Sequence, residues 1–220
     1  MNKIVVKRAI NDRQKEARRE AILKGARDLF TEAGFFDVSM AMIAKHSGLA
    51  KGTVYLYFKT KEEIFLALST EELEAWLDDF DSRLTVLAGP IENAEFLDIL
   101  QRSFEGRTAM QRLLSLLHLV LEKNITYEEA FCFKQNLIRR TDFTGKLIEK
   151  ALPYLSCGQG ISVLTLLQCL VVGWVQMSDH SPVIEKVLEH PQMAPFKFDL
   201  QKNLFESLSL LLAGLKATAE

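Results

Sequence analysis

The segment from Met40 to Lys61 constrains the fold most strongly, because it reads as two short helices joined by a tight turn. Ile43 and Ala44 are spaced to face inward from the first helix, and Gly48 then interrupts the helical pattern. Residues Lys51 to Phe58 form the second helix, which begins with small and polar groups. A turn containing glycine, followed by a helix with a slim N-terminus, is typical of a helix-turn-helix motif, whose second helix enters the DNA major groove.

The rest of the chain also predicts helices, because its apolar residues recur at helical spacing and no stretch alternates as a strand would. We expect residues 1–12 to form a flexible basic arm, Gly34 to end the first long helix, and the region of Asp142 and Gly145 to interrupt a later one. The predicted fold is all-α. A three-helix helix-turn-helix domain occupies residues 1–62, and a helical domain occupies residues 63–220.

Charge is divided unevenly along the chain. Residues 1–61 hold thirteen Lys or Arg and six Asp or Glu, whereas the whole chain holds 27 and 29. A basic N-terminal part joined to an acidic remainder indicates a nucleic-acid-binding head. A solvated basic helix would give the same imbalance, so the charge supports the interpretation of the motif without deciding it.

A family resemblance rests on the same residues. The string I-A-x-x-S-G-L-A-K-G-T-V-Y-x-Y-F-K-x-K, from Ile43 to Lys61, resembles the DNA-binding domain of TetR-family transcriptional repressors. The resemblance extends back through Ala21–Gly34 and forward through Glu62–Leu66. It implies a homodimer that binds double-stranded DNA at a palindromic operator.

Seven residues are expected to contact DNA: Ser39, Lys51, Gly52, Thr53, Tyr55, Tyr57 and Lys61. The resemblance implies base contacts at Lys51 and Gly52 and mostly phosphate contacts at the positions that follow. A long cation at the start of a helix can reach guanine O6 and N7, and the ammonium of Lys61 at a helix N-terminus suits a phosphate. Ser39 is also placed to cap the helix after it. Tyr55 has a second interpretation, as a core aromatic with a solvated hydroxyl.

The C-terminal domain carries the regulatory expectations. The resemblance implies that this domain dimerises and often binds a small molecule. Residues that would line a pocket for an unidentified hydrophobic effector are Phe104, Arg112, Leu113, Leu117, His118, Phe131, Cys132, Gln168, Trp174 and Met177. Each of them has an alternative role in the core. The alternative function is a DNA-bound factor whose body binds a protein partner.

Two long helices near the C-terminus, Gly160–Ser178 and Leu200–Lys216, are expected to form an intermolecular four-helix bundle. The predicted interface comprises Leu164, Leu167, Val171, Val172, Val175, Leu204, Leu208, Leu211, Leu212 and Leu215. These stripes could instead face only their own domain. A membrane-spanning helix is an alternative interpretation of the uncharged stretch from Ala151 to Ser178. Its polar residues, however, leave apolar runs shorter than the ~20 residues that a span needs. We therefore expect no membrane association.

The remaining reactive side chains predict no catalysis. Cys132, Cys157 and Cys169 have spacings that suit neither a disulfide framework nor zinc, so we expect reduced thiols in the core, with a redox sensor as the alternative. The four histidines are scattered, and no glycine-rich phosphate loop or nucleophile elbow appears. The sequence therefore predicts no metal, cofactor or enzymatic activity. It predicts a cytoplasmic, homodimeric transcriptional regulator, a repressor that a ligand releases from DNA.

Overall fold

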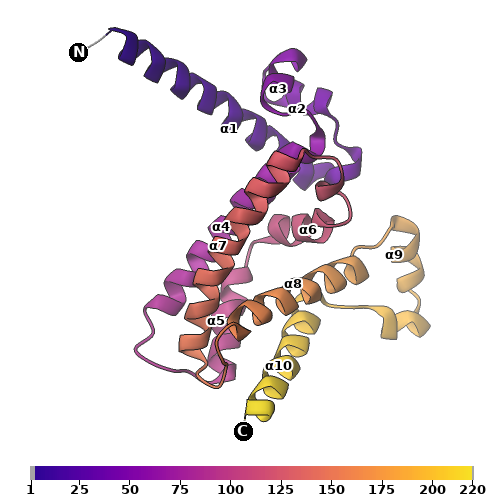
Figure 1. The fold of residues 1–220 in the computed structure, drawn as a ribbon. Helices are drawn as coiled ribbons and strands as arrows, with labels where there is room; N and C mark the ends of the chain where they lie inside the picture. Colours follow the sequence, from indigo (N-terminus) through magenta and orange to yellow (C-terminus); the bar gives the residue numbers. More distant parts are fainter. Residues whose placement is uncertain (1–2, 220) are drawn as a thin grey trace. The chain divides into compact units, whose positions relative to one another are not determined.

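The computed structural model describes the backbone of residues 3–219 and the side chains of residues 12–219, and this part of the chain is helical without a strand (Figure 1). The predicted all-α class is therefore confirmed. The α-helices are α1 (Lys3–Asp37), α2 (Met40–His46), α3 (Lys51–Tyr57), α4 (Lys61–Thr85), α5 (Asn93–Phe104), α6 (Thr108–Leu117), α7 (Tyr127–Ala151), α8 (Gln159–Ser178), α9 (Pro182–Leu188) and α10 (Leu200–Ala219). Two short 3₁₀ helices, η1 (Leu121–Lys123) and η2 (Pro191–Phe196), lie between them.

The helices gather into two compact units. The first, called the head here, runs as far as Thr70 and also contains the segment Leu117–Glu129. The second, called the body, contains Glu71–Leu116 and Ala130–Glu220. The division therefore lies beyond the predicted boundary at residue 62, and a segment from the middle of the chain joins the head. Helical periodicity within each element does not reveal that a mid-chain segment belongs to the head.

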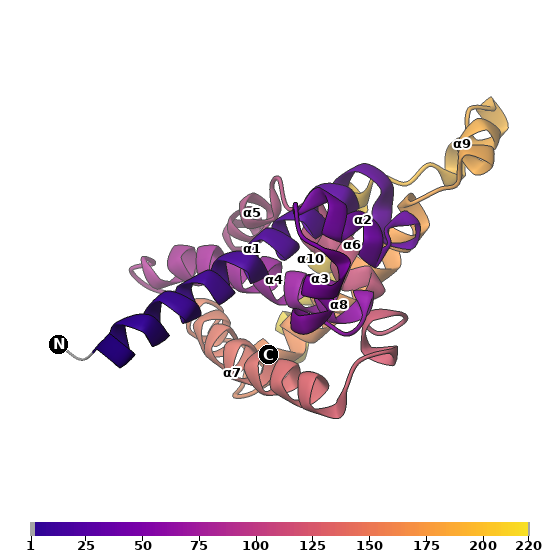
Figure 2. The same cartoon turned by 90° about the horizontal axis from the view of Figure 1, so that it is seen from above.

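The head is built on α1, with α2 packed beside its C-terminal half (Figure 2). Helix α1 begins at Lys3, so the flexible arm expected at residues 1–12 is wrong for residues 3–12; residues 1 and 2 lie outside the described part. No glycine or proline interrupts the first 24 residues, which explains the continuous helix. Gly34, at φ 79° and ψ 175°, breaks the regular helix where a stop is expected, but α1 resumes after this kink and ends at Asp37.

Glycine allows α1 and α2 to approach closely. A Cβ at Gly25 would lie 2.7 Å from the hydroxyl oxygen of Ser47, which already donates to the carbonyl of Ile43 at 2.6 Å. The core beneath this contact is apolar and fully enclosed, and it contains Ile22, Leu23, Ala26, Phe30, Ile43, Val54, Ile64 and Phe65.

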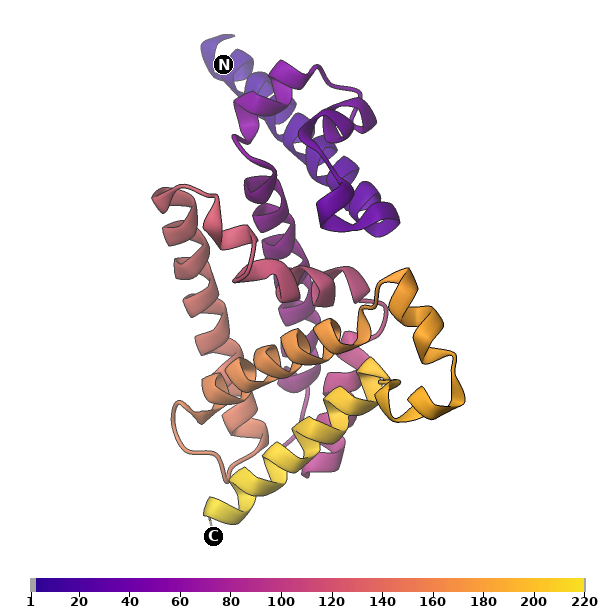
Figure 3. The same ribbon diagram turned by 90° about the vertical axis from the view of Figure 1, so that its right-hand side faces the viewer.

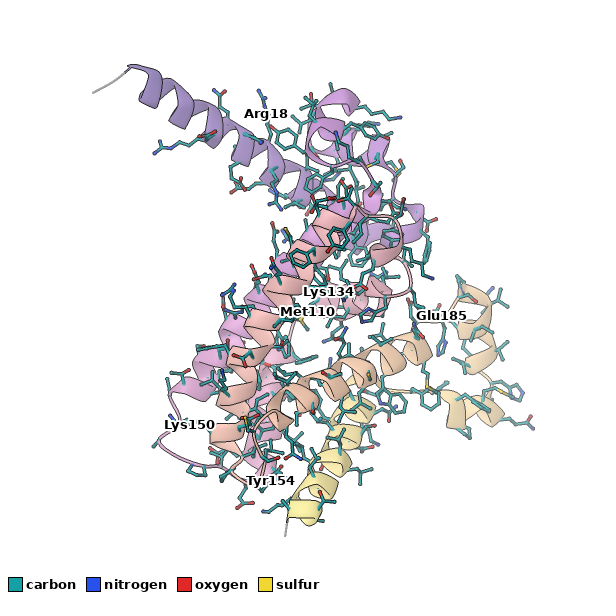
Figure 4. The ribbon with its side chains drawn as sticks, viewed as in Figure 1. Arg18, Met110, Lys134, Lys150, Tyr154 and Glu185 are labelled. Carbon is teal, nitrogen blue, oxygen red and sulfur yellow. The ribbon has the colours of Figure 1, made fainter. Side chains whose placement is uncertain are left out.

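The body has an aromatic core. Trp76 stacks on Phe80 with centroids 5.8 Å apart, and Phe104 meets Trp76 edge-on at 5.1 Å. The Trp76 indole donates to the Ser103 hydroxyl at 3.0 Å. Met110, labelled in Figure 4, is buried in the same unit. Helix α6 ends at Leu117, and this residue is also the first of the segment that belongs to the head.

Helices α7 and α8 cross at a pair of glycines. A Cβ at Gly160 would lie 2.0 Å from the carbonyl oxygen of Gly145, so only glycine fits there. The carboxylate of Glu149 caps α8 by accepting from the amides of Gly158 at 2.8 Å and Gly160 at 3.0 Å. Helix α7 is continuous through Gly145, so the expected interruption is wrong. Gly145 serves the crossing and does not end the helix.

Helix α8 packs against α10 within the body (Figure 3). By length and composition alone α8 could cross a membrane, although one third of its most apolar window is buried here and core helices of soluble proteins meet the same criterion. Cys132, Cys157 and Cys169 are exposed, so their expected place in the core is wrong. Each lies on a helix face or connection that turns away from the body core.

Candidate nucleic-acid interface

The helix-turn-helix forms as predicted, and its local geometry fixes the direction of α3. Ser39 begins α2, and its hydroxyl accepts from the amide of Met42 at 3.3 Å. Gly48, at φ 68°, makes the turn between α2 and α3. Val54 is fully buried, so it anchors α3 on the head core. Ala50 provides no side-chain cap at the start of α3, as its side chain leads one to expect.

The outward face of α3 is slim at its N-terminus. Lys51, Gly52, Tyr55 and Leu56 are exposed, whereas Thr53 and Tyr57 are half-buried. A Cβ at Gly52 would meet nothing within 4 Å, so the backbone there is open to a ligand. The ammonium of Lys51 lies 5.9 Å from the centroid of the Tyr55 ring. Tyr55 is 36% exposed and lies beside Lys51, so both interpretations of its ring remain open.

Lys61 lies differently from what the sequence suggests. Its ammonium donates to the carbonyls of Phe35 at 2.8 Å and Val38 at 2.9 Å, and it lies 4.0 Å from the centroid of the Phe35 ring. Burial lowers the pKa of Lys61 below its ordinary value, although the nearby Glu62 and Asp37 act in the opposite direction. These bonds occupy two of its three donors and join α4 to the end of α1, and the phosphate contact expected at Lys61 stays a prediction.

Other cations frame α3. Lys45 and Lys59 are exposed, and the ammonium of Lys59 donates to the carbonyl of Tyr55 at 3.1 Å. His46 lies 3.4 Å from the carboxylate of Asp28. On α1, Arg18 is exposed and is labelled in Figure 4. The hydroxyl of Ser39 caps α2. To contact DNA as well, the same hydroxyl would have to serve both interactions.

Leu56 is the residue of α3 that sequence reasoning missed. Its side chain is 78% exposed. It occupies the variable position between the two tyrosines of V-Y-x-Y-F, where the motif itself specifies no residue. An apolar residue at a variable position of a recognition helix was the available signal.

The segment Leu117–Glu129 contacts the start of α4 inside the head. The Thr60 hydroxyl donates to the carbonyl of Asn124 at 3.0 Å, and the Asn124 amide donates to the carboxylate of Glu62 at 3.1 Å. Leu121 is fully buried and anchors the segment. The connection from α6 to α7 therefore contacts the turn between α3 and α4 within the head.

The structure does not gather the ten predicted pocket residues. Phe104, Leu113 and Leu117 are buried, whereas Phe131, Cys132 and Met177 are exposed. His118 is exposed, belongs to the head and lies 3.2 Å from Glu122. The remaining three, Arg112, Gln168 and Trp174, are half-buried, and the Trp174 indole donates to Ser207 at 3.1 Å. Among the described residues, no cluster of three or more His, Cys, Asp or Glu could hold a metal ion.

Comparison with known families covers nearly the whole chain. Residues 22–68 match the model described as bacterial regulatory proteins, tetR family, and residues 70–219 match the tetracyclin repressor-like C-terminal domain. The chain belongs to the TetR family. Its members are transcriptional regulators with a DNA-binding helix-turn-helix, and repression and homodimerisation are typical of them.

Curated relatives match over part of the chain. The chain is 35% identical over 66 residues to the fatty acid metabolism regulator protein of Bacillus subtilis, covering 30% of this chain and 34% of that protein. It is 33% identical over 90 residues to the transcriptional regulator UidR of Escherichia coli, covering 41% and 42%. The chain therefore spans less than half the length of these two relatives.

Solved structures share the fold of both units. The fatty acid degradation regulator FadR of Bacillus halodurans has a TM-score of 0.58 at 21% identity, covering 90% of this chain and 95% of that chain. A regulator of Rhodococcus sp. RHA1 has a TM-score of 0.61 at 14% identity, covering 89% and 95%. At these identities the likeness concerns the fold alone.

Proposed function

We propose that this TetR-family regulator represses transcription by binding a palindromic operator as a homodimer, and that a small apolar ligand releases it. The observation that carries the DNA-binding part is the exposed face of α3, where Lys51, Gly52 and Tyr55 stand on a Lys- and Arg-rich head. A slim, cationic helix face suits the major groove, and a dimer presents two such helices to successive grooves about 34–36 Å apart.

Selection of DNA fragments by the purified protein would test this directly. Lys51→Ala removes a side chain that reaches the bases, so it is expected to weaken binding to the selected operator by about 1–3 kcal/mol per good base contact. The variant should also relax preference at one base pair per half-site. Lys15→Ala removes an exposed cation on α1 and is the matched control. Equal operator affinity and preference in wild type and Lys51→Ala would contradict the assignment of α3 as the recognition helix.

The exposed face of α8, which carries no charge, and the apolar part of the exposed face of α10 beyond Lys202 and Glu206 support a dimer. Most of the predicted interface residues, including Leu164, Leu167, Leu204 and Leu208, are buried in the protomer's own core. The opposite faces remain exposed and carry Ile161, Thr165, Leu166, Cys169, Gly173, Met177, Leu210, Ala213, Gly214 and Ala217. We therefore assign the contact to this second set, because an exposed apolar surface favours association.

Substitutions on these faces separate dimerisation from folding. Leu166→Glu and Leu210→Glu would place a charge in the interface, where burial without a partner is costly, and should yield monomers that bind the operator weakly. Ile138→Glu, on an exposed part of α7, is the matched control and should leave the dimer intact. Sedimentation at micromolar concentration gives the readout. A wild-type monomer that binds its operator tightly would overturn the dimer assignment.

The effector is the less constrained part of the proposal. The family resemblance and the apolar body support a hydrophobic ligand, and fatty acids are the first compounds to screen because one relative and one structural neighbour are named as fatty acid regulators. The Asn124 contacts with Thr60 and Glu62 offer a route to α3, since ligand-driven movement of α6 or α7 would pull on them.

Fluorescence anisotropy with labelled operator and a panel of medium- and long-chain fatty acids would test release. A fatty acid that stabilises the protein and lowers operator affinity supports the proposal, and Asn124→Ala should reduce this ligand effect while leaving ligand binding intact. Asn136→Ala removes an asparagine from the part of α7 that lies in the body, and it serves as the control for Asn124→Ala. Tight binding that leaves operator affinity unchanged would favour the alternative, in which the body binds a protein partner.

A further inference from the structure

Leu56 is an unusual surface residue for a nucleic-acid interface. At 78% exposure it is the most exposed of the large apolar side chains among the described residues of the head. Its neighbours on α3 are a cation, a glycine and two tyrosines. Nothing in the fold requires leucine here, because the packing of α3 on the head is supplied by the fully buried Val54. The side chain is therefore available to a ligand of the exposed face.

The helical period places Leu56 beside the bare part of α3. Residues four apart share a face, and helical side chains lean toward the N-terminus, so Leu56 leans over the turn that carries Gly52. A Cβ at Gly52 would meet nothing within 4 Å. Lys51 and Tyr55 form an adjacent pair on the same helix, with the ammonium 5.9 Å from the ring centroid. The exposed face thus has an apolar spot next to a cationic one.

The DNA major groove offers one apolar group on its base edges, the C5 methyl of thymine. A hydrated phosphate or a base oxygen gains nothing from an aliphatic side chain, whereas leucine and a methyl group both gain by leaving water. On a head that carries thirteen Lys or Arg within its first 61 residues, nucleic acid is the partner that charge favours. Resting on the proposed DNA-binding role of α3, we propose that Leu56 specifies a thymine in each operator half-site by contact with its methyl group.

Deoxyuridine provides a direct probe, because it differs from thymidine only in lacking this methyl group. Each thymine of the selected operator is replaced in turn, and binding is measured by anisotropy for wild type and Leu56→Ala. In wild type, one position per half-site should lose affinity by about fourfold, the factor expected for one buried methyl-sized group. Leu56→Ala should bind thymine and deoxyuridine equally at that position.

Two further variants control for other causes. Leu56→Met keeps an apolar side chain of similar volume and should retain the methyl preference. Val86→Ala shortens an equally exposed aliphatic residue that lies in the body and should change nothing. Since Leu56 and Val86 are both exposed, all three variants should unfold at the wild-type temperature, so loss of fold does not confuse the result.

The outcomes separate this proposal from the function on which it rests. If wild type selects an operator but shows no deoxyuridine penalty at any position, the Leu56 assignment is wrong and DNA binding stands. If Leu56→Ala retains the full penalty, another residue such as Tyr55 reads the methyl and the assignment is again wrong. If wild type selects no DNA sequence at all, the proposed function itself fails.

Discussion

The ammonium of Lys61 lies 2.8 Å from the main-chain oxygen of Phe35 and 4.0 Å from the centroid of its ring. The carbonyl of Val38 accepts from the same nitrogen at 2.9 Å. The first residue of α4 thus satisfies two carbonyls at the end of α1 and in the connection to α2. Because helix ends leave carbonyls without intrahelical partners, this side chain completes the head.

Lys61→Met should therefore destabilise the head. It keeps the aliphatic stem but removes the ammonium that donates to two partly buried carbonyls, of which that of Phe35 also accepts from the Val38 amide at 3.4 Å. A hydrogen bond from a charged donor contributes about 1.5–3 kcal/mol. Denaturant unfolding, followed at a fixed protein concentration because the protein is expected to dimerise, measures the change. Lys24→Met removes an exposed lysine from α1 and should leave stability nearly unchanged.

The salt dependence of DNA binding distinguishes this role from a phosphate contact. A phosphate contact contributes a slope of about −0.9 in the logarithm of affinity against the logarithm of salt concentration. Under conditions where Lys61→Met remains folded, we expect the wild-type slope. A slope reduced by about one unit per head, together with unchanged stability, would restore Lys61 to the phosphate contacts.

The sequence predicts the head well because its signals are local. Gly34 and Gly48 adopt the positive φ that glycine at a helix stop and a tight turn requires. Ser39 caps α2, and the absence of a cap at Ala50 follows from its side chain. Helix spacing, capping groups and turn glycines all act within a few residues, so their pattern in the chain is enough to predict them.

The residues whose surroundings the sequence does not predict are those placed by packing between distant segments. Leu164 and Leu208 lie on apolar stripes, but periodicity does not say whether a stripe faces its own domain or a partner, and both face their own core. His118 joins the head because the chain leaves the body at the end of α6. Lys61 meets Phe35 across 26 residues of sequence, which no local signal reveals.

Gly52→Ala should separate stability from DNA binding. The new Cβ meets no protein atom within 4 Å, and alanine is favoured over glycine inside a helix by about 0.5–1 kcal/mol, so the unfolding free energy should rise. The same methyl projects toward the DNA face, where it would hold the backbone away from the bases. We expect tighter folding and weaker operator binding in the same variant. Unchanged operator affinity would mean that the backbone at this position stays clear of DNA.

Gly160→Ala should disrupt the crossing of α7 and α8. Its Cβ would lie 2.0 Å from the carbonyl oxygen of Gly145, so the two helices must separate. Overpacking of this kind typically costs about 1–3 kcal/mol and sometimes more, and here backbone must move on both helices. Thermal unfolding would show the loss, with Gly52→Ala as the matched glycine that has open space. A variant as stable as wild type would show that the crossing can relax without cost.

Asp81→Asn should reveal that ionisation of Asp81 destabilises the folded body as the pH rises. The Asp81 carboxylate is buried and accepts from the Thr144 hydroxyl at 2.7 Å and from Arg140 at 3.2 Å. Burial raises the pKa of Asp81, and the bonds from Thr144 and Arg140 only partly offset it. The folded state therefore holds this proton more tightly than the unfolded state does. The favourable contribution of Asp81 is complete below the unfolded pKa of about 3.9 and is lost as pH rises through the folded pKa.

Asparagine resembles the neutral acid and does not ionise, so the variant escapes this loss. Relative to wild type, Asp81→Asn should gain stability as the pH is raised from below the unfolded pKa of about 3.9 through the higher folded pKa. Urea unfolding across this range gives the measurement, and Asp98→Asn, which removes an exposed carboxylate paired with Arg102, is the control. If the Asp81→Asn variant instead loses stability relative to wild type as the pH rises, the attraction of Arg140 for the ionised carboxylate outweighs its burial, and the direction assigned to this pKa is wrong.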